Sequence, residues 1–166
     1  MPSLKDRTVL VIGRGSGIAR AIALAVSEEG GRVIAAGRHP EGLAGAYPGR
    51  DIAVEQVDVT DEASVAALAE RVAKADHVVS TASARARGGY RDLTPSLVNA
   101  SFATKVTGAL LLARHFTTRL PPGGSFLFLS GATALKPAPG MLALAVLANG
   151  FLTGVSLPVD GGEHLV

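Results

Sequence analysis

Three closely spaced glycines, Gly13, Gly15 and Gly17, follow the apolar run Thr8–Ile12 and precede an alanine-rich stretch. This order predicts a buried strand, a glycine turn and the start of a helix. Such a junction brings backbone N–H groups and the positive end of a helix dipole to one point, which suits a diphosphate. We expect Gly13 to adopt the backbone angles of the tight turn, and Gly15 and Gly17 to leave room for a phosphate. The predicted nucleotide-binding residues of this turn are Gly13, Arg14, Gly15, Ser16, Gly17 and Ile18.

The spacing of the glycines separates two kinds of dinucleotide motif. The pattern G-x-G-x-x-G fails, because Ile18 stands where its third glycine would be. The pattern G-x-x-x-G-x-[G/A] fits through Gly13, Gly17 and Ala19, and it resembles that of the short-chain dehydrogenase/reductase family. The resemblance implies a Rossmann-type fold, a nicotinamide dinucleotide cofactor and hydride transfer to or from a carbonyl or alcohol carbon. A turn with a purely structural role is the alternative.

Two arginines stand where the adenosine end of such a nucleotide is expected. Proteins that bind NAD place an acidic residue after the second strand, whereas this chain has Arg38 there. The guanidinium groups of Arg38 and of Arg14 in the glycine turn suit a 2′-phosphate, because each is planar, always charged and donates paired hydrogen bonds. These positions favour NADP(H) over NAD(H), against the alternative of two solvated surface arginines.

The resemblance also implies cofactor contacts after the third and fourth strands. Asp58 and Val59 follow the third strand, where the family places an aspartate beside the adenine. The alternative for Asp58 is a cap of the next helix. After the fourth strand the family has Asn-Asn-Ala-Gly, and here Thr81, Ala82 and Ser83 keep the small size but not the amides.

The catalytic residues of the family are missing from their usual places. Its reductases use a Tyr-x-x-x-Lys pair, but the residues four positions after Tyr47 and Tyr90 are an aspartate and a threonine. Ser130, near the end of the fifth strand, and Lys105, where the family has asparagine, are the polar candidates closest to the reacting carbon. The alternatives are a structural serine and a surface lysine.

The end of the chain, residues 149–162, resembles the last strand and Val-Asp-Gly-Gly ending of the family. The segment equivalent to the family's catalytic helix and substrate lid is absent around residues 142–149. A true deletion and residues beyond those printed are both open. Without the family's sixth strand, the last strand must pair with the fifth or with another molecule.

Apolar runs alternate along the chain with stretches of helical periodicity. The predicted fold class is α/β, a Rossmann-type doubly wound parallel sheet with helices on both faces in three α/β/α layers, built as one domain over residues 1–166. Asp61 is the expected N-cap of the second long helix. Strands are expected at 7–12, 32–36, 52–57, 77–81 and 125–129, and helices at 18–29, 62–75 and 95–120.

Composition limits the partners and the compartment. The 166 residues are 48% hydrophobic and include no cysteine, which excludes disulfides and thiolate metal sites. No apolar stretch reaches the roughly 18 residues of a membrane span and no signal core is visible, so we expect a cytoplasmic protein without membrane contact. A net charge of +2, scattered cations and 4% aromatic residues argue against nucleic acid. The apolar run Ala109–Leu112 on the last helix favours a homo-oligomer, a dimer or a tetramer.

The resulting functional prediction is an NADP(H)-dependent oxidoreductase that acts on an unidentified small carbonyl or alcohol. The alternative is a relative that binds NADP(H) without catalysing a reaction, which the missing tyrosine and lysine favour. A basic interaction module built on Arg85, Arg87 and Arg91 is a third and weaker interpretation.

Overall fold

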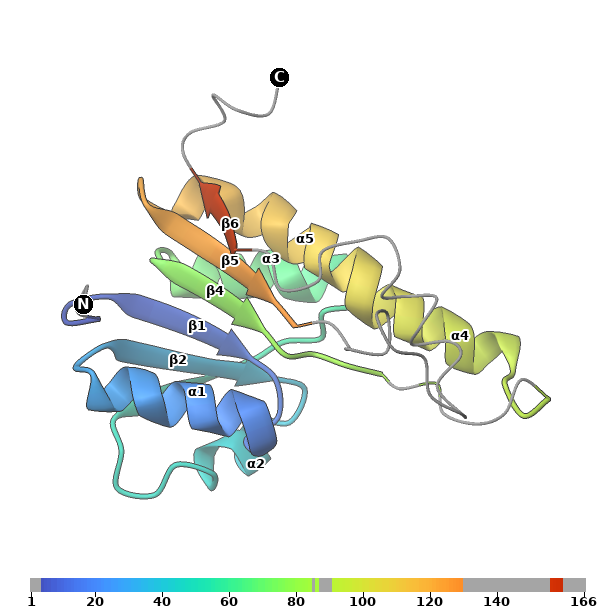
Figure 1. Ribbon diagram of the computed structural model, residues 1–166, viewed down its shortest axis with the longest axis horizontal. Helices are drawn as coiled ribbons and strands as arrows, with labels where there is room; N and C mark the ends of the chain where they lie inside the picture. The colour runs from blue at the N-terminus through green and yellow to red at the C-terminus, as the bar shows by residue number, and fades with distance from the viewer. Residues whose placement is uncertain (1–3, 85, 87–90, 130–155, 160–166) are drawn as a thin grey trace.

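A six-stranded sheet of order β3-β2-β1-β4-β5-β6 forms the centre of the molecule (Figure 1). The computed structural model describes residues 4–84, 86, 91–129 and 156–159. The first five strands pair in parallel. The strands are β1 Thr8–Ile12, β2 Arg32–Gly37, β3 Ile52–Gln56, β4 His77–Ser80, β5 Gly124–Phe128 and β6 Ser156–Val159.

Helices cover both faces of the sheet (Figure 1). The helical segments are α1 Gly17–Glu28, α2 Pro40–Ala44, α3 Glu62–Val72, α4 Pro95–Phe102, the π-helical turn η1 Ala103–Thr107, α5 Gly108–Phe116 and the 3₁₀ turn η2 Thr117–Arg119. Residues of α1 and α2 share one buried cluster, and residues of α3 and α5 share the other. The described residues therefore confirm the predicted three-layer, doubly wound α/β fold.

Strand β1 shows why four of its five residues, Val9 to Ile12, are apolar. Val9 and Val11 belong to the cluster beneath α1, whereas Leu10 and Ile12 belong to the cluster beneath α3 and α5. A strand buried on both faces has no solvent side, so the usual alternation of apolar and polar residues disappears. Each of these side chains contributes about 1.5–3 kcal/mol on burial.

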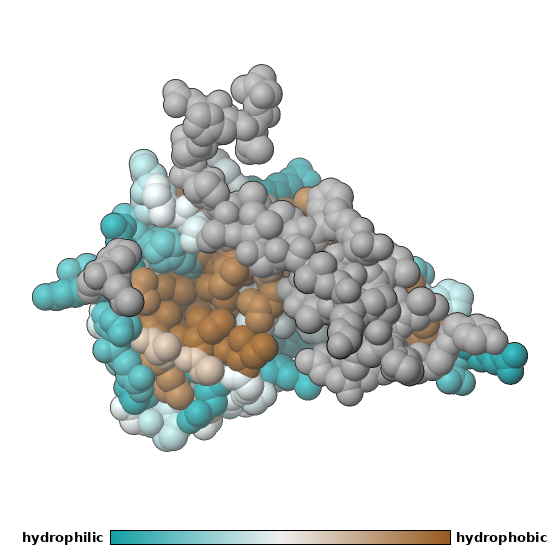
Figure 2. Space-filling view, in the orientation of Figure 1, coloured by the Kyte–Doolittle hydropathy of each residue, from teal (hydrophilic) through white to brown (hydrophobic). Residues whose placement is uncertain are grey.

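The cluster on the α1 face extends to half-buried side chains of the sheet. Leu127 and the adjoining Leu129 pack against it without being fully buried. Hydrophobic residues are visible over the sheet next to α1 on the face shown in Figure 2.

The predicted boundaries of β1 to β5 and of α1 agree with the structure within one residue at each end. Asp61 caps α3 as predicted, since its Oδ1 accepts the Ala63 N–H at 3.0 Å. The predicted end of α3 at residue 75 is wrong, because the backbone of Ala73 turns to a φ of +52° and stops the helix three residues earlier. The five-residue helix α2, which begins at Pro40, was not predicted; it is too short for a visible period.

The predicted long helix is present as the continuous run Pro95–Arg119, in which η1 interrupts the α-helical geometry. Leu112 and Phe116 are fully buried in the core beneath it. Within the described residues, this one helix is long and apolar enough to cross a membrane by length and composition. The count of uninterrupted apolar residues missed this property, because Lys105 and Arg114 break the run.

Strand β6 pairs with β5, which is one of the two pairings that the sequence left open, and it runs antiparallel, with Leu157 opposite Phe126. The prediction of a wholly parallel sheet is wrong at this position. That prediction rested on apolar strands that alternate with helices, whereas β6 is a four-residue edge strand that contains Pro158. An antiparallel edge strand on an otherwise parallel sheet is common, and proline is tolerated there because one side of the strand needs no partner.

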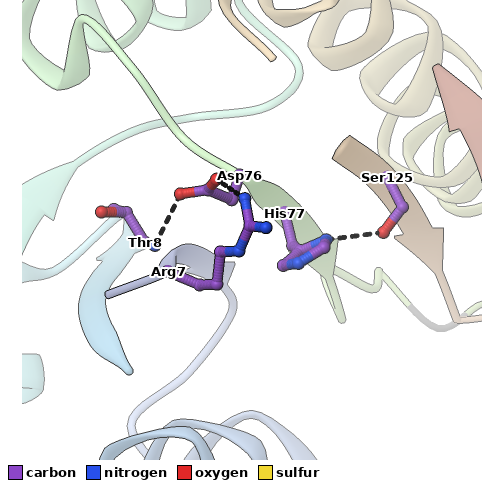
Figure 3. Close-up of polar contacts among 5 residues, drawn as sticks. All are labelled: Arg7, Thr8, Asp76, His77 and Ser125. Carbon is purple, nitrogen blue, oxygen red and sulfur yellow. Dashed lines mark hydrogen bonds and ion pairs between the residues drawn. The ribbon is translucent and has the colours of Figure 1, made fainter. Parts of the chain in front are cut away.

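A buried carboxylate ties the amino-terminal ends of β1 and β4 together (Figure 3). Asp76 Oδ2 accepts the Thr8 N–H at 2.9 Å, and Oδ1 accepts from Arg7 Nη1 at 2.8 Å. Beside it, His77 Nδ1 and Ser125 Oγ lie 2.9 Å apart and link β4 to β5. Burial raises the pKa of the Asp76 carboxyl, but the hydrogen bonds from Thr8 and Arg7 and the charges of Arg7 and Lys74 outweigh burial and lower it.

We predict that Asp76→Asn lowers the free energy of unfolding by about 2 kcal/mol at neutral pH, since hydrogen bonds to a charged group are lost. A pKa that is lower in the folded state gives stability that is present above the unfolded pKa and lost as the pH falls through the folded pKa. The difference between wild type and variant in urea titrations must therefore shrink on acidification. Asp51→Asn, at an exposed position, is the control. A difference that is independent of pH would contradict this account.

Candidate nucleotide-binding site

The predicted cofactor-binding residues lie in segments at one end of the sheet, because the carboxyl-terminal ends of parallel strands lie together (Figure 1). Strand β1 pairs with β2 on one side and with β4 on the other. The chain therefore leaves β1 in one direction and later returns to its other side, and such a switch point is where open α/β sheets bind ligands. The segments that follow β1, β2, β3 and β4 carry all the predicted cofactor contacts.

Gly13 follows β1 at a position with no space for a side chain. A Cβ there would lie 2.2 Å from Thr81 Oγ1 and 2.9 Å from Ala19 Cβ. The Gly13 N–H donates to the Ala36 carbonyl at 2.9 Å, so the turn is fastened to β2. The expectation that Gly13 is needed for its backbone angles is wrong, because its φ is not positive. Glycine is required there for close packing.

The left-handed residue of the turn is Gly17, with a φ of +56°. A Cβ on Gly17 would have nothing within 4 Å in the described part of the chain. The N-cap Ser16 makes no side-chain hydrogen bond to α1, and Ser16, Gly17 and Ile18 are exposed, Ile18 at 60%. The first N–H groups of α1 thus face an open cradle, which fits a diphosphate.

A packing contact that the sequence did not reveal requires glycine at position 15. A Cβ on it would lie 2.5 Å from Ala46 Cβ, so the missing side chain lets the turn pack against the loop after α2. Arg14, next to it, is exposed. The prediction that Gly15 makes room for a phosphate is not tested by this contact, but the packing alone requires glycine.

The end of β2 carries the residue predicted to bind the adenosine phosphate. Gly37 passes so close to the turn that a Cβ would lie 2.6 Å from the Gly13 carbonyl oxygen. Arg38 follows at the surface, and its charge is near enough to contribute to the lowered pKa of Asp58. Arg38 therefore stands beside the loop that follows β3, on the β2 side of the switch point.

Asp58 stabilises the loop after β3 and does not cap a helix. Its Oδ1 accepts from Thr60 Oγ1 at 2.7 Å and from the Thr60 N–H at 2.9 Å. The Thr60 hydroxyl and then its N–H lower the pKa of the Asp58 carboxyl, against a rise from burial. The alternative of a helix cap is wrong, since Asp61 has that role. The side chain of Val59 is buried beneath Gly108.

The loop after β4 forms the other wall of the switch point. The Thr81 N–H and hydroxyl both donate to the Ile12 carbonyl, at 2.8 and 3.2 Å, and the Ala82 N–H donates to Ser80 Oγ. Thr81, Ala82 and Ser83 are half-buried. A buried residue that the sequence did not single out, Ser101 of α4, bonds to the backbone of this loop at Ala84 and Ala86.

The two catalytic candidates differ in what the structure says of them. Lys105, in η1, donates from Nζ to the Leu129 carbonyl at 2.6 Å, so its half-buried ammonium group lies where the chain leaves β5. The alternative of a solvated surface lysine is wrong for this side chain. Ser130 lies outside the described residues.

A glycine turn that opens a helix at a topological switch point is typical of α/β nucleotide-binding proteins. Comparison with known families places the chain more exactly. Residues 12–147 match the family model described as enoyl-(acyl carrier protein) reductase. The chain belongs to the short-chain dehydrogenase/reductase family, whose members are oxidoreductases that use an NAD(P)-type cofactor.

Known relatives and solved structures agree with this assignment. Versicolorin reductase 1 of Aspergillus parasiticus is 31% identical over 141 residues, which cover 79% of this chain and 54% of that protein. A short-chain type dehydrogenase/reductase from Mycobacterium ulcerans superposes with a TM-score of 0.80 at 27% identity, covering 89% of this chain and 59% of the other. A short-chain dehydrogenase from Streptomyces avermitilis gives 0.78 and 27%, with 87% and 56% covered. The chain thus spans little more than half the length of these relatives.

We predict that Gly17→Asn weakens NADPH binding at least tenfold while the protein stays folded. Asparagine tolerates a positive φ, and no described atom obstructs its Cβ, but its side chain would occupy the cradle before α1. Calorimetric titration gives the Kd, and urea titration gives the free energy of unfolding.

Gly49→Asn is the matched control, since Gly49 has a φ of +69° and open space but precedes β3 at the opposite edge of the sheet. Equal losses of NADPH binding in the two variants would contradict the assignment of the cradle.

Proposed function

We propose that the chain binds NADP(H) and serves a hydride transfer to or from a carbonyl or alcohol carbon. The observation that carries the proposal is the exposed cradle at the amino end of α1, formed by Ser16, Gly17 and Ile18. Arg38 is exposed directly after β2, on the side of β1 where we expect the adenosine. When bound, the nicotinamide supplies the hydride, and the protein holds the diphosphate and orients the two partners.

The preference for NADP(H) rests on charge at the end of β2. The exposed guanidinium of Arg38 follows Gly37 directly, in the place where an acid would accept from a ribose hydroxyl. Its neighbour Asp58 is turned toward Thr60 by two hydrogen bonds, which leaves the arginine as the ligand for a 2′-phosphate. Exposed Arg14 supplies a second cation from the glycine turn.

We predict that Arg38→Gln weakens NADPH binding about tenfold and leaves NADH binding within about twofold, because one charge-assisted phosphate contact is lost. Arg32→Gln is the control: Arg32 is an exposed arginine at the other end of the same strand. The two dissociation constants are measured for each protein by calorimetry. An unchanged ratio of the two constants in Arg38→Gln would refute the role of this residue.

For the chemical step we propose Lys105, together with Ser130, as the polar groups nearest the reacting carbon. Lys105 brings a positive charge to the end of β5, where its Nζ donates to the Leu129 carbonyl. An ammonium group there stabilises negative charge that develops on a carbonyl oxygen. Versicolorin reductase 1 is named a reductase, which supports reduction as the direction of the reaction.

The catalytic proposal is tested by following NADPH consumption with a panel of aliphatic and aromatic ketones. Consumption that falls strongly in Lys105→Met, at an unchanged Kd for NADPH, is the expected result. A protein that binds NADPH and consumes it with none of the ketones would favour the alternative of a nucleotide-binding relative without catalysis.

We also propose that the protein is a cytoplasmic homo-oligomer in which a second copy covers the long helix. Phe102 and Leu110 are 39% and 56% exposed on this helix, and resemblance to the family implies that it builds a dimer interface. Large apolar side chains that stay in water favour association.

We predict that Leu110→Glu shifts the mass measured by light scattering toward that of one chain, because a carboxylate cannot be buried there without a partner. Thr118→Glu, exposed near the end of the same helix, is the control. A wild-type protein with the mass of one chain would contradict the proposal.

A further inference from the structure

Ser101 is a fully buried hydroxyl whose hydrogen bonds leave its own helix. Its exposure is 0%, although it lies in α4 among residues that are mostly exposed. The hydroxyl donates to the Ala84 carbonyl and accepts the Ala86 N–H at 3.0 Å. A serine in a helix usually bonds to the preceding turn, as Thr104 does with the Ala100 carbonyl. Ser101 instead forms both of its hydrogen bonds with the backbone of a neighbouring loop.

The loop held by Ser101 begins where β4 ends, next to the glycine turn. At its start, the Thr81 N–H bonds to the end of β1, and Thr81 Oγ1 lies against Gly13 of the glycine turn. At its other end, Ala86 is buried beside α4. The described residues between these attachments are the half-buried Ala82, Ser83 and Ala84. The path of this short stretch is therefore set by β1 on one side and by Ser101 on the other.

The position of the loop determines which half of a dinucleotide it touches. Arg38 and the end of β2 lie on one side of β1, and the loop after β4 lies on the other side. With the diphosphate at the glycine turn and the adenosine toward β2, the nicotinamide half extends over the end of β4. The loop fixed by Ser101 is the wall on that side.

We propose that Ser101 is a positioning residue for the nicotinamide half of the cofactor, acting through the backbone of Ala82–Ala84. This inference rests on the proposed function. The same helix reaches two further strand ends, since Lys105 binds the Leu129 carbonyl and Gly108 lies against Val59. One helix thus fastens the segments that follow β3, β4 and β5, and Ser101 is its contact with the segment beside the nicotinamide.

The test compares two ligands that share the adenosine half. NADPH occupies both halves of the site, whereas 2′,5′-ADP has only the phosphorylated adenosine. We expect Ser101→Ala to weaken NADPH binding about tenfold, which corresponds to the free energy of about one hydrogen bond. The Kd of 2′,5′-ADP should stay within about twofold of the wild-type value. Amide hydrogen exchange must also rise at Ala86. Thr104→Val, which removes a hydroxyl bonded only within the helix, is the matched control and should change none of the three quantities.

The possible outcomes distinguish a failure of the proposed role of Ser101 from a failure of the proposed function. If the wild type binds neither ligand, the nucleotide site itself is wrong and the role of Ser101 falls with it. If the wild type binds both ligands and Ser101→Ala binds NADPH equally well, only the role of Ser101 is overturned. An equal loss of both ligands in Ser101→Ala would assign the residue to general stability, and it would overturn the positioning role as well.

Discussion

The architecture of the site depends on how closely three backbone segments approach where β1, β2 and β4 end. Side chains are excluded at two points, because a Cβ on Gly13 would meet Thr81 and a Cβ on Gly37 would meet the Gly13 carbonyl. Hydrogen bonds from Gly13 to Ala36 and from Thr81 to Ile12 then hold the segments together. This contact fixes where α1 begins, and so where its unpaired N–H groups point.

The two edges of the sheet satisfy their polar groups in opposite ways. At the amino-terminal edge, Asp76 takes up the Thr8 N–H and the Arg7 guanidinium, and His77 pairs with Ser125. At the carboxyl-terminal edge, Ser16 leaves the first turn of α1 without a side-chain cap. Buried polar groups that are fully paired stabilise a fold, whereas donors left open at a helix start are available to a ligand.

The sequence revealed most of the fold because its strands are apolar on both faces, as Thr8–Ile12 shows, and because Asp61 is a strong local cap. The glycines and Arg38 carried the prediction of the candidate site, and the structure places them in segments that follow neighbouring strands. The packing that requires glycine at positions 13 and 15 could not be predicted, since Gly13 and Gly15 pack against Thr81 and Ala46, which are distant in the sequence. No local pattern marks a buried serine that binds another loop, so Ser101 escaped notice. The direction of β6 depends on pairing at the sheet edge, which periodicity does not encode.

The π-helical turn η1 separates the long helix into two parts with different neighbours. Before and within it, Ser101 and Lys105 contact loops at the edge of the sheet, and after it, Leu112 and Phe116 enter the core. A π turn accommodates one more residue than an α turn, which offsets the two parts by about one residue's rotation of 100°. The residues that hold the loops and the residues that fill the core therefore lie on differently oriented parts of one continuous helix.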